Sequence, residues 1–142
     1  MPLRVLRLLA LLTVVPATAL TVAIRPAVAQ TTVSPFAAFS SAMQRGDADA
    51  LAQGLADRVL VSLDGDSRVY SREQARHVFA RFFRDHPADR FALDYPRETG
   101  GEALFASGRY VSDGETYVVR VLMSGTARRT LREVRIERGR LE

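Results

Sequence analysis

Few side chains in this sequence are suited to catalysis by their type and spacing. The chain has 2 histidines and no cysteine, so thiol catalysis and thiolate metal sites are excluded. His77 lies within a predicted helix, near the border of its polar face. His86 precedes Pro87 at the end of that helix, where an imidazole can pair with free carbonyl groups. We interpret both histidines as structural, because no carboxylate stands at a spacing that would complete a metal site.

One carboxylate invites a catalytic interpretation. Asp94 lies between Leu93 and Tyr95 in a predicted strand, and a buried acid there could act as a base. Alternation along the strand argues against this, since Phe91, Leu93 and Tyr95 share one face and Asp94 belongs to the other. We therefore expect Asp94 to face away from the core.

Recognisable motifs for metal, nucleophile or nucleotide chemistry are missing. Asp64-Gly65-Asp66 is interpreted as a turn, because two carboxylates without further oxygen ligands make a poor calcium site. The sequence has no Gly-x-Ser-x-Gly elbow, no phosphate-binding glycine loop and no dinucleotide fingerprint. It therefore predicts no catalytic residue, no metal ligand and no cofactor.

Tyrosines and arginines on the predicted strands could instead line a binding pocket. A tyrosine offers an apolar ring with a polar tip, and an arginine offers a cation to an anionic ligand. The alternative is that the tyrosines pack in the core while the arginines pair with glutamates on the outer face. The predicted ligand-binding residues are Tyr95, Tyr110, Tyr117, Arg109 and Arg120.

The beginning of the chain has the order of a secretory signal peptide. Residues 1–7 carry two arginines and no acid, residues 8–15 are apolar except Thr13, and small residues follow. A retained membrane anchor over residues 8–24 is the competing interpretation, but Pro16 interrupts it and it is short for a bilayer of about 30 Å. We expect an exported protein, periplasmic or secreted, with residues 1–29 as signal peptide, residues 30–142 as a single domain, and no stable anchor after cleavage.

Net charge gives little support to a nucleic-acid partner. The whole chain carries +4, but three arginines belong to the leader, which leaves 17 basic residues against 16 acidic ones. Only the C-terminal stretch is rich in arginine, and Glu133 and Glu137 interrupt it. Polyanion binding needs a concentrated basic face, so we interpret this stretch as a solvated strand face with salt bridges.

The elements that must position these residues follow from periodicity. Ser34-Pro35 and Asp47 predict the starts of two short helices separated by Gly46, the second reaching Leu55. Ser71 and Gln74 predict a capping box for a third helix with a phenylalanine-rich face. The expected strands are Val59–Leu63 and an extended Ser67–Tyr70, followed by an antiparallel meander of Arg90–Tyr95, Ala103–Val111, Thr116–Met123 and Leu131–Ile136.

Several local motifs occur in an order that resembles a known family. They are Gly46-Asp47, Tyr70-Ser71-Arg72 with Gln74-Ala75, Phe82-Phe83 with His86-Pro87, Gly108, Gly114-x-x-Tyr117, and Leu131-Arg132-x-Val134-x-Ile136-Glu137. From Phe36 to Glu137 the chain resembles a secreted bacterial domain-of-unknown-function family within the nuclear transport factor 2-like superfamily. The resemblance implies an α+β fold, with three N-terminal helices packed on a curved, mainly antiparallel sheet. It also implies a cone-shaped pocket and often a homodimer through the sheet face.

Two functional classes fit this sequence. The first, which we favour, is a non-enzymatic exported domain that binds a small ligand or an envelope partner. The second is a cone-fold enzyme of the isomerase or hydratase type. An enzyme needs an ionisable group in the pocket with a second polar group in reach, and because the predicted inward positions are apolar or aromatic, we expect no such pair.

The position of cleavage is directly testable. Ala27-Val28-Ala29 has the small residues that signal peptidase accepts, so N-terminal sequencing of the protein exported from a bacterial host is expected to start at Gln30. A start at Leu20 would select the earlier Ala17-Thr18-Ala19 site, and an intact leader would contradict cleavage altogether.

Overall fold

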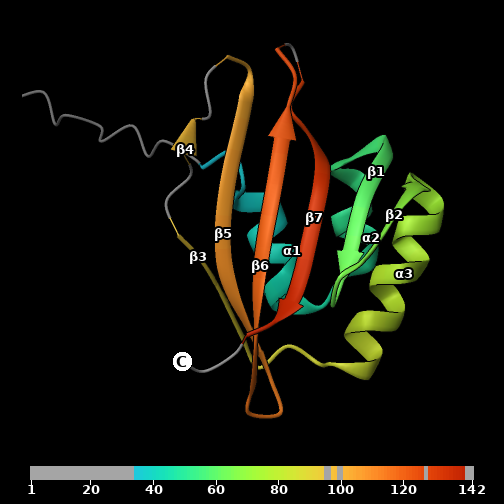
Figure 1. Cartoon of the computed structure of the whole chain (residues 1–142), viewed down its shortest axis with the longest axis vertical. Helices are drawn as coiled ribbons and strands as arrows, with labels where there is room; N and C mark the ends of the chain where they lie inside the picture. The colour runs from blue at the N-terminus through green and yellow to red at the C-terminus, as the bar shows by residue number, and fades with distance from the viewer. Residues whose placement is uncertain (1–33, 95–96, 99–100, 127, 140–142) are drawn as a thin grey trace, which may run out of the picture. The chain divides into compact units, whose positions relative to one another are not determined.

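The computed structural model describes residues 34–94, 97–98, 101–126 and 128–139 (Figure 1). The predicted signal peptide lies outside these residues. No helix within the described part of the chain is long and apolar enough to cross a membrane. The elements, in chain order, are α1 (Ala37–Arg45), α2 (Ala48–Gln53), β1 (Leu55–Leu63), β2 (Asp66–Ser71), α3 (Arg72–Asp85), β3 (Arg90–Leu93), β4 (Arg97–Glu98), β5 (Ala103–Ser112), β6 (Glu115–Ser124) and β7 (Thr130–Arg138).

The corner between α1 and α2 forms as the sequence predicts. Gly46 ends α1 with a φ of 62°, a left-handed conformation that glycine adopts without steric cost. The side chain of Asp47 caps α2 by accepting a hydrogen bond of 2.9 Å from the backbone N–H of Ala50. The two short helices are therefore joined by local chemistry alone.

Two predicted boundaries are wrong. The Ser34 hydroxyl accepts from a free backbone amide as predicted, that of Phe36 at 3.3 Å, but this bond belongs to a turn that Ala37 N–H closes on the Ser34 carbonyl at 2.9 Å, and the helix itself begins at Ala37. Leu55 is not helical, because α2 ends at Gln53 with Gly54 as its C-cap, and Leu55 begins β1, fully buried and in register with Leu131 of β7. A tertiary contact outweighs helical periodicity at that position.

The third helix, α3, is capped at its start and buries one apolar face in the core. Ser71 and Gln74 form the predicted capping box: the Ser71 hydroxyl accepts from the Gln74 N–H and the Gln74 side chain accepts from the Ser71 N–H. Its buried residues are Ala75, Phe79, Phe82 and Phe83, spaced so that they share one face of the helix.

All the strands belong to one curved sheet. Its order is β2-β1-β7-β6-β5-β3, and β4 pairs additionally with β5. The β1–β7 pair is parallel and the other pairs are antiparallel, so the sheet is mainly antiparallel, as expected. Asp64-Gly65 and Asp113-Gly114 turn the hairpins β1–β2 and β5–β6 with positive φ at both residues. The domain is thus α+β, with α1 and α2 behind the sheet in the view of Figure 1.

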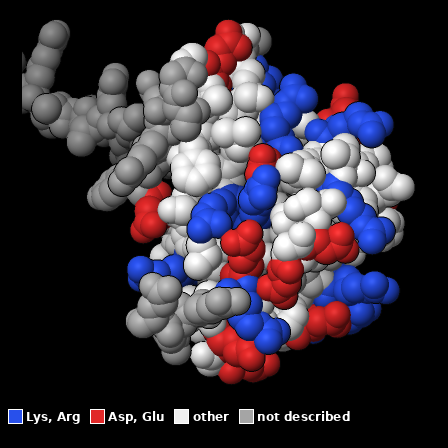
Figure 2. Space-filling view, in the orientation of Figure 1, with Lys and Arg blue, Asp and Glu red and all other residues white. Residues whose placement is uncertain are grey.

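Alternation along the long strands separates a core face from an outer face. In β5 and β6 the buried positions include Tyr110, Tyr117, Val119 and Val121, which pack with the helices. The opposite face carries charges of both signs among uncharged side chains (Figure 2). Arg120 pairs with Glu137 at 3.0 Å, and Arg135 pairs with Glu133. This is the pattern expected for a solvated face with salt bridges.

Close approach of β3 to β5 requires a glycine. A Cβ on Gly108 would lie 2.4 Å from the carbonyl oxygen of Ala92 and 3.1 Å from the Cα of Leu93. Both contacts are with backbone atoms, which cannot turn aside as a side chain can. Gly108 therefore allows β3 to pair with β5 at the edge of the sheet.

Substituting this glycine should destabilise the domain. We expect Gly108→Ala to lower the free energy of unfolding by about 1–3 kcal/mol through overpacking, as measured by urea denaturation. Arg109→Ala, at the exposed neighbouring position of the same strand, should change it by less than about 0.5 kcal/mol. Equal stability of Gly108→Ala and wild type would contradict the close approach.

Candidate functional site

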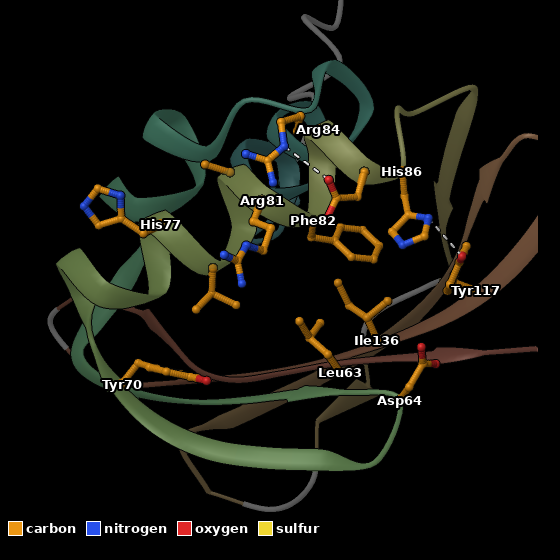
Figure 3. A pocket seen from close by; sticks show the side chains of 13 residues that line it. Leu63, Asp64, Tyr70, His77, Arg81, Phe82, Arg84, His86, Tyr117 and Ile136 are labelled. Atoms are coloured by element: carbon orange, nitrogen blue, oxygen red, sulfur yellow. Dashed lines mark hydrogen bonds and ion pairs between the residues drawn. The ribbon is translucent and has the colours of Figure 1, made fainter.

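A hollow of about 800 Å³ lies between α3 and the β1–β2 hairpin. We call it the α3 pocket. Its wall is formed by α3 from His77 to Asp85 and by His86 just beyond the helix, and its floor is formed by residues of β1, β2, β6 and β7 (Figure 3). The volume is in the range of pockets that hold small organic molecules.

The floor of the α3 pocket is apolar. Leu63 and Ile136 from the sheet and Phe82 from α3 meet at its centre (Figure 3). Tyr70 reaches in from β2 with its hydroxyl toward the middle, and Val78 adds apolar surface from α3. A ligand that enters would bury an apolar part here and meet polar groups around it.

One cation in the pocket is left without an anionic partner. Arg84 pairs with Asp85 at 3.2 Å. The carboxylate of Asp64 accepts the backbone N–H of Arg138 at 2.8 Å. Arg81 points from α3 into the pocket (Figure 3) and has no hydrogen bond or ion pair among the residues that the structure describes. Its guanidinium is therefore available to an anionic ligand.

At the other end of the pocket an imidazole is held against the sheet. His86 follows the last turn of α3, and its Nδ1 lies 3.2 Å from the hydroxyl of Tyr117 on β6. That hydroxyl donates to Oε2 of Glu115 at 3.0 Å. Phe82 packs against both rings, with centroid distances of 5.1 Å to His86 and 5.8 Å to Tyr117.

Two buried phenols lie at this end of the pocket: Tyr117 lines it and Tyr110 lies behind it. Tyr110 is fully buried and its hydroxyl donates to the backbone oxygen of His86. Burial, together with the charge of Asp89, raises the pKa of Tyr110 to about 12. Burial also raises the pKa of Tyr117, and its hydrogen bond to Glu115 acts in the same direction. Both side chains are therefore neutral hydrogen-bond donors at physiological pH.

The structure separates the five ligand-binding residues that the sequence suggested. Tyr117 lines the α3 pocket, and Tyr110 lies behind it in the core. Arg109 and Arg120 are exposed on the outer face of β5 and β6, where Arg120 pairs with Glu137 at 3.0 Å. The structure thus does not bring these arginines to the pocket. Tyr95 lies outside the described residues.

The structure also places Asp94 and His77, the other two side chains considered for catalysis or metal binding. Asp94 is exposed and accepts a hydrogen bond of 3.3 Å from the Ser107 hydroxyl, so it faces away from the core as expected. His77 is exposed at the mouth of the pocket, where its Nε2 lies 3.2 Å from Glu73. No group of three or more histidine, aspartate or glutamate residues in the described part of the chain is arranged to hold a metal ion.

Sequence reasoning missed His86 and Arg81. The expectation was that no imidazole deep in the pocket would have a hydrogen-bonded partner; His86, at the rim of the pocket, has one in Tyr117. Its partner is 31 residues away along the chain, so no local pattern indicates it. Arg81 lies on the polar face of α3. The sequence pattern cannot distinguish an arginine on that face that points into a pocket from one that points into solvent.

Comparisons with known proteins agree with this fold. A DUF4783 protein from Bacteroides uniformis is 18% identical, with a TM-score of 0.68 over 73% of this chain and 96% of that one. A DUF4783 protein from Bacteroides ovatus is also 18% identical, with a TM-score of 0.69 over 74% and 96%. An NTF-2 like protein of unknown function from Burkholderia xenovorans is 13% identical, with a TM-score of 0.60 over 76% and 82%.

These structural similarities show the fold but no activity, since fold alone does not determine function. No curated protein matches the chain. The model of the domain of unknown function DUF4783 matches residues 36–137, which is the stretch over which the sequence motifs resemble such a family. The chain belongs to the DUF4783 family, with an NTF2-like fold.

Proposed function

We propose that this protein is an exported domain that binds a small amphipathic anion in the α3 pocket. The observation that carries the proposal is the unpaired guanidinium of Arg81 beside an apolar floor. Export is supported by the signal-peptide order of residues 1–29.

The pocket offers contacts to both the apolar part and the anionic part of such a ligand. Burial of an alkyl chain against Leu63, Phe82 and Ile136 contributes about 25 cal/mol for each Å² removed from water. A carboxylate can then form a charge-assisted hydrogen bond with Arg81. Of the two carboxylates that line the pocket, Asp85 pairs with Arg84 and Asp64 accepts the backbone N–H of Arg138.

An enzyme of the isomerase or hydratase type is the second candidate. The specific observation in its favour is the imidazole of His86 with the Tyr117 hydroxyl in reach, at the rim of the same pocket. Binding and catalysis are compatible, because a catalytic pocket must first bind its substrate.

Binding can be tested with decanoate as a probe anion. We expect saturable heat of binding in isothermal titration with the protein lacking residues 1–29, and much weaker binding of the neutral analogue decanol. Arg81→Gln should weaken decanoate binding roughly 10-fold, the value of one charge-assisted contact of about 1.4 kcal/mol.

Arg109→Gln is the matched control, because it removes the same charge from the outer face of the sheet. It should leave decanoate affinity unchanged. Wild-type protein that does not bind decanoate, or equal loss of affinity in both variants, would rule out Arg81 as the anion-binding group.

A further inference from the structure

A chain of hydrogen bonds runs from the α3 pocket to the surface. His86 Nδ1 lies 3.2 Å from the Tyr117 hydroxyl, and that hydroxyl lies 3.0 Å from the Glu115 carboxylate. Tyr117 is 1% exposed, whereas the Glu115 side chain is 52% exposed. The chain therefore links a pocket-lining imidazole to a solvated carboxylate through one buried phenol.

Donor and acceptor counting fixes the tautomer of His86. A phenol has one proton, and Tyr117 donates it to Glu115, which can only accept while ionised. The phenol oxygen has two lone pairs and accepts from the Arg138 side chain and, at 3.2 Å, from the imidazole, so Nδ1 carries the proton in neutral His86. Nε2 is left with its lone pair.

The free nitrogen faces the pocket. In Figure 3, Nδ1 of His86 is turned toward Tyr117, and the other ring nitrogen is directed toward the space above Ile136. Packing of Phe82 and Tyr117 on the ring, with centroids at 5.1 and 5.3 Å, holds this orientation. A base with a fixed lone pair directed at a bound molecule is the arrangement that proton abstraction requires.

We propose that His86 is a general base that removes a proton from a carbon atom of a molecule bound in the α3 pocket, with Tyr117 as its positioning residue. Nε2 takes the proton, the C–H bond breaks, and its electron pair moves onto an adjacent carbonyl oxygen of the ligand to form an enolate. Return of the proton to a different carbon gives an isomer. The step needs no oxidant or reductant.

The substrate class follows from the pocket. It is a small, largely apolar molecule whose C–H bond is activated by a carbonyl group, as the floor of Leu63, Phe82 and Ile136 demands. The positive charge that develops on His86 is stabilised through Tyr117 by Glu115. The inference uses the pocket of the proposed function but does not depend on Arg81 or on an anionic ligand.

Base strength can be measured with 5-nitrobenzisoxazole, a neutral carbon acid. Removal of its ring C–H proton forms a nitrile while the N–O bond breaks, and the coloured nitrophenolate is followed by absorbance. His86→Asn keeps an N–H near the position of Nδ1 and removes the base. We expect it to lower kcat/KM about 100-fold, as is typical of a lost general base.

The second histidine of the chain is the matched control. His77 lies at the mouth of the pocket, paired with Glu73 and outside the hydrogen-bond chain, so His77→Asn should react as fast as wild type. Equal rates for His86→Asn and wild type, or an equal loss in both variants, would overturn the proposal. Added imidazole should restore the rate of His86→Gly, and failure of that rescue would also contradict it.

Decanoate titration of the same variants separates the two proposals. If the His86→Asn variant binds decanoate as wild type does, it is folded and its pocket is open. Its lower reaction rate then reflects the loss of the base. If wild type does not bind decanoate but reacts with 5-nitrobenzisoxazole through His86, the anion-binding proposal is refuted and the general-base proposal stands.

The role of Tyr117 has its own spectroscopic readout. Nitrogen chemical shifts of the neutral His86 ring should show the Nδ1–H tautomer in wild type and a shift toward Nε2–H in Tyr117→Phe. The same variant should lower kcat about 10-fold with little change in KM. A wild-type ring in the Nε2–H tautomer would disprove the assignment.

Discussion

Packing of α3 on the two inward tyrosines determines where the rest of the site lies. The ring of Phe82 is 5.4 Å from that of Tyr110 and 5.8 Å from that of Tyr117. Aromatic pairs of this kind contribute about 0.5–1.5 kcal/mol each beyond burial. They fix the C-terminal end of α3 on β5 and β6, and this places His86 beside β6. The flank of α3 that faces β2 borders the α3 pocket.

Local signals were enough to predict most of the elements. The Ser71–Gln74 capping box, the left-handed Gly46 and the Asp47 cap are each completed within a few residues, so the sequence contains all the partners. The hairpin turns are equally local, because Asp-Gly pairs adopt the required positive φ. What could not be predicted locally is the parallel pairing of β1 with β7, which joins Leu55 to Leu131.

The site was predicted less well, for two different physical reasons. Arg109 adjoins Tyr110 in β5, and Arg120 is three residues from Tyr117 in β6. With the tyrosines inward, alternation puts both arginines on the outer face, so a signal for that existed. His86 had no such signal. Its hydrogen bond to Tyr117 depends on how α3 lies on the sheet, which follows from the packing of Phe82.

The phenol of Tyr117, between the imidazole and the carboxylate, avoids the cost of burying a charge next to His86. A carboxylate in direct contact with His86 at the buried Tyr117 position would lose its hydration, at a cost of several kcal/mol. Tyr117 is neutral, because burial and the bond to Glu115 both raise its pKa, so its burial carries no charge penalty. Glu115 keeps its charge in solvent, paired with Arg138 at 3.4 Å. The phenol thus transmits the orienting effect of a carboxylate to the pocket while the charge itself stays at the surface.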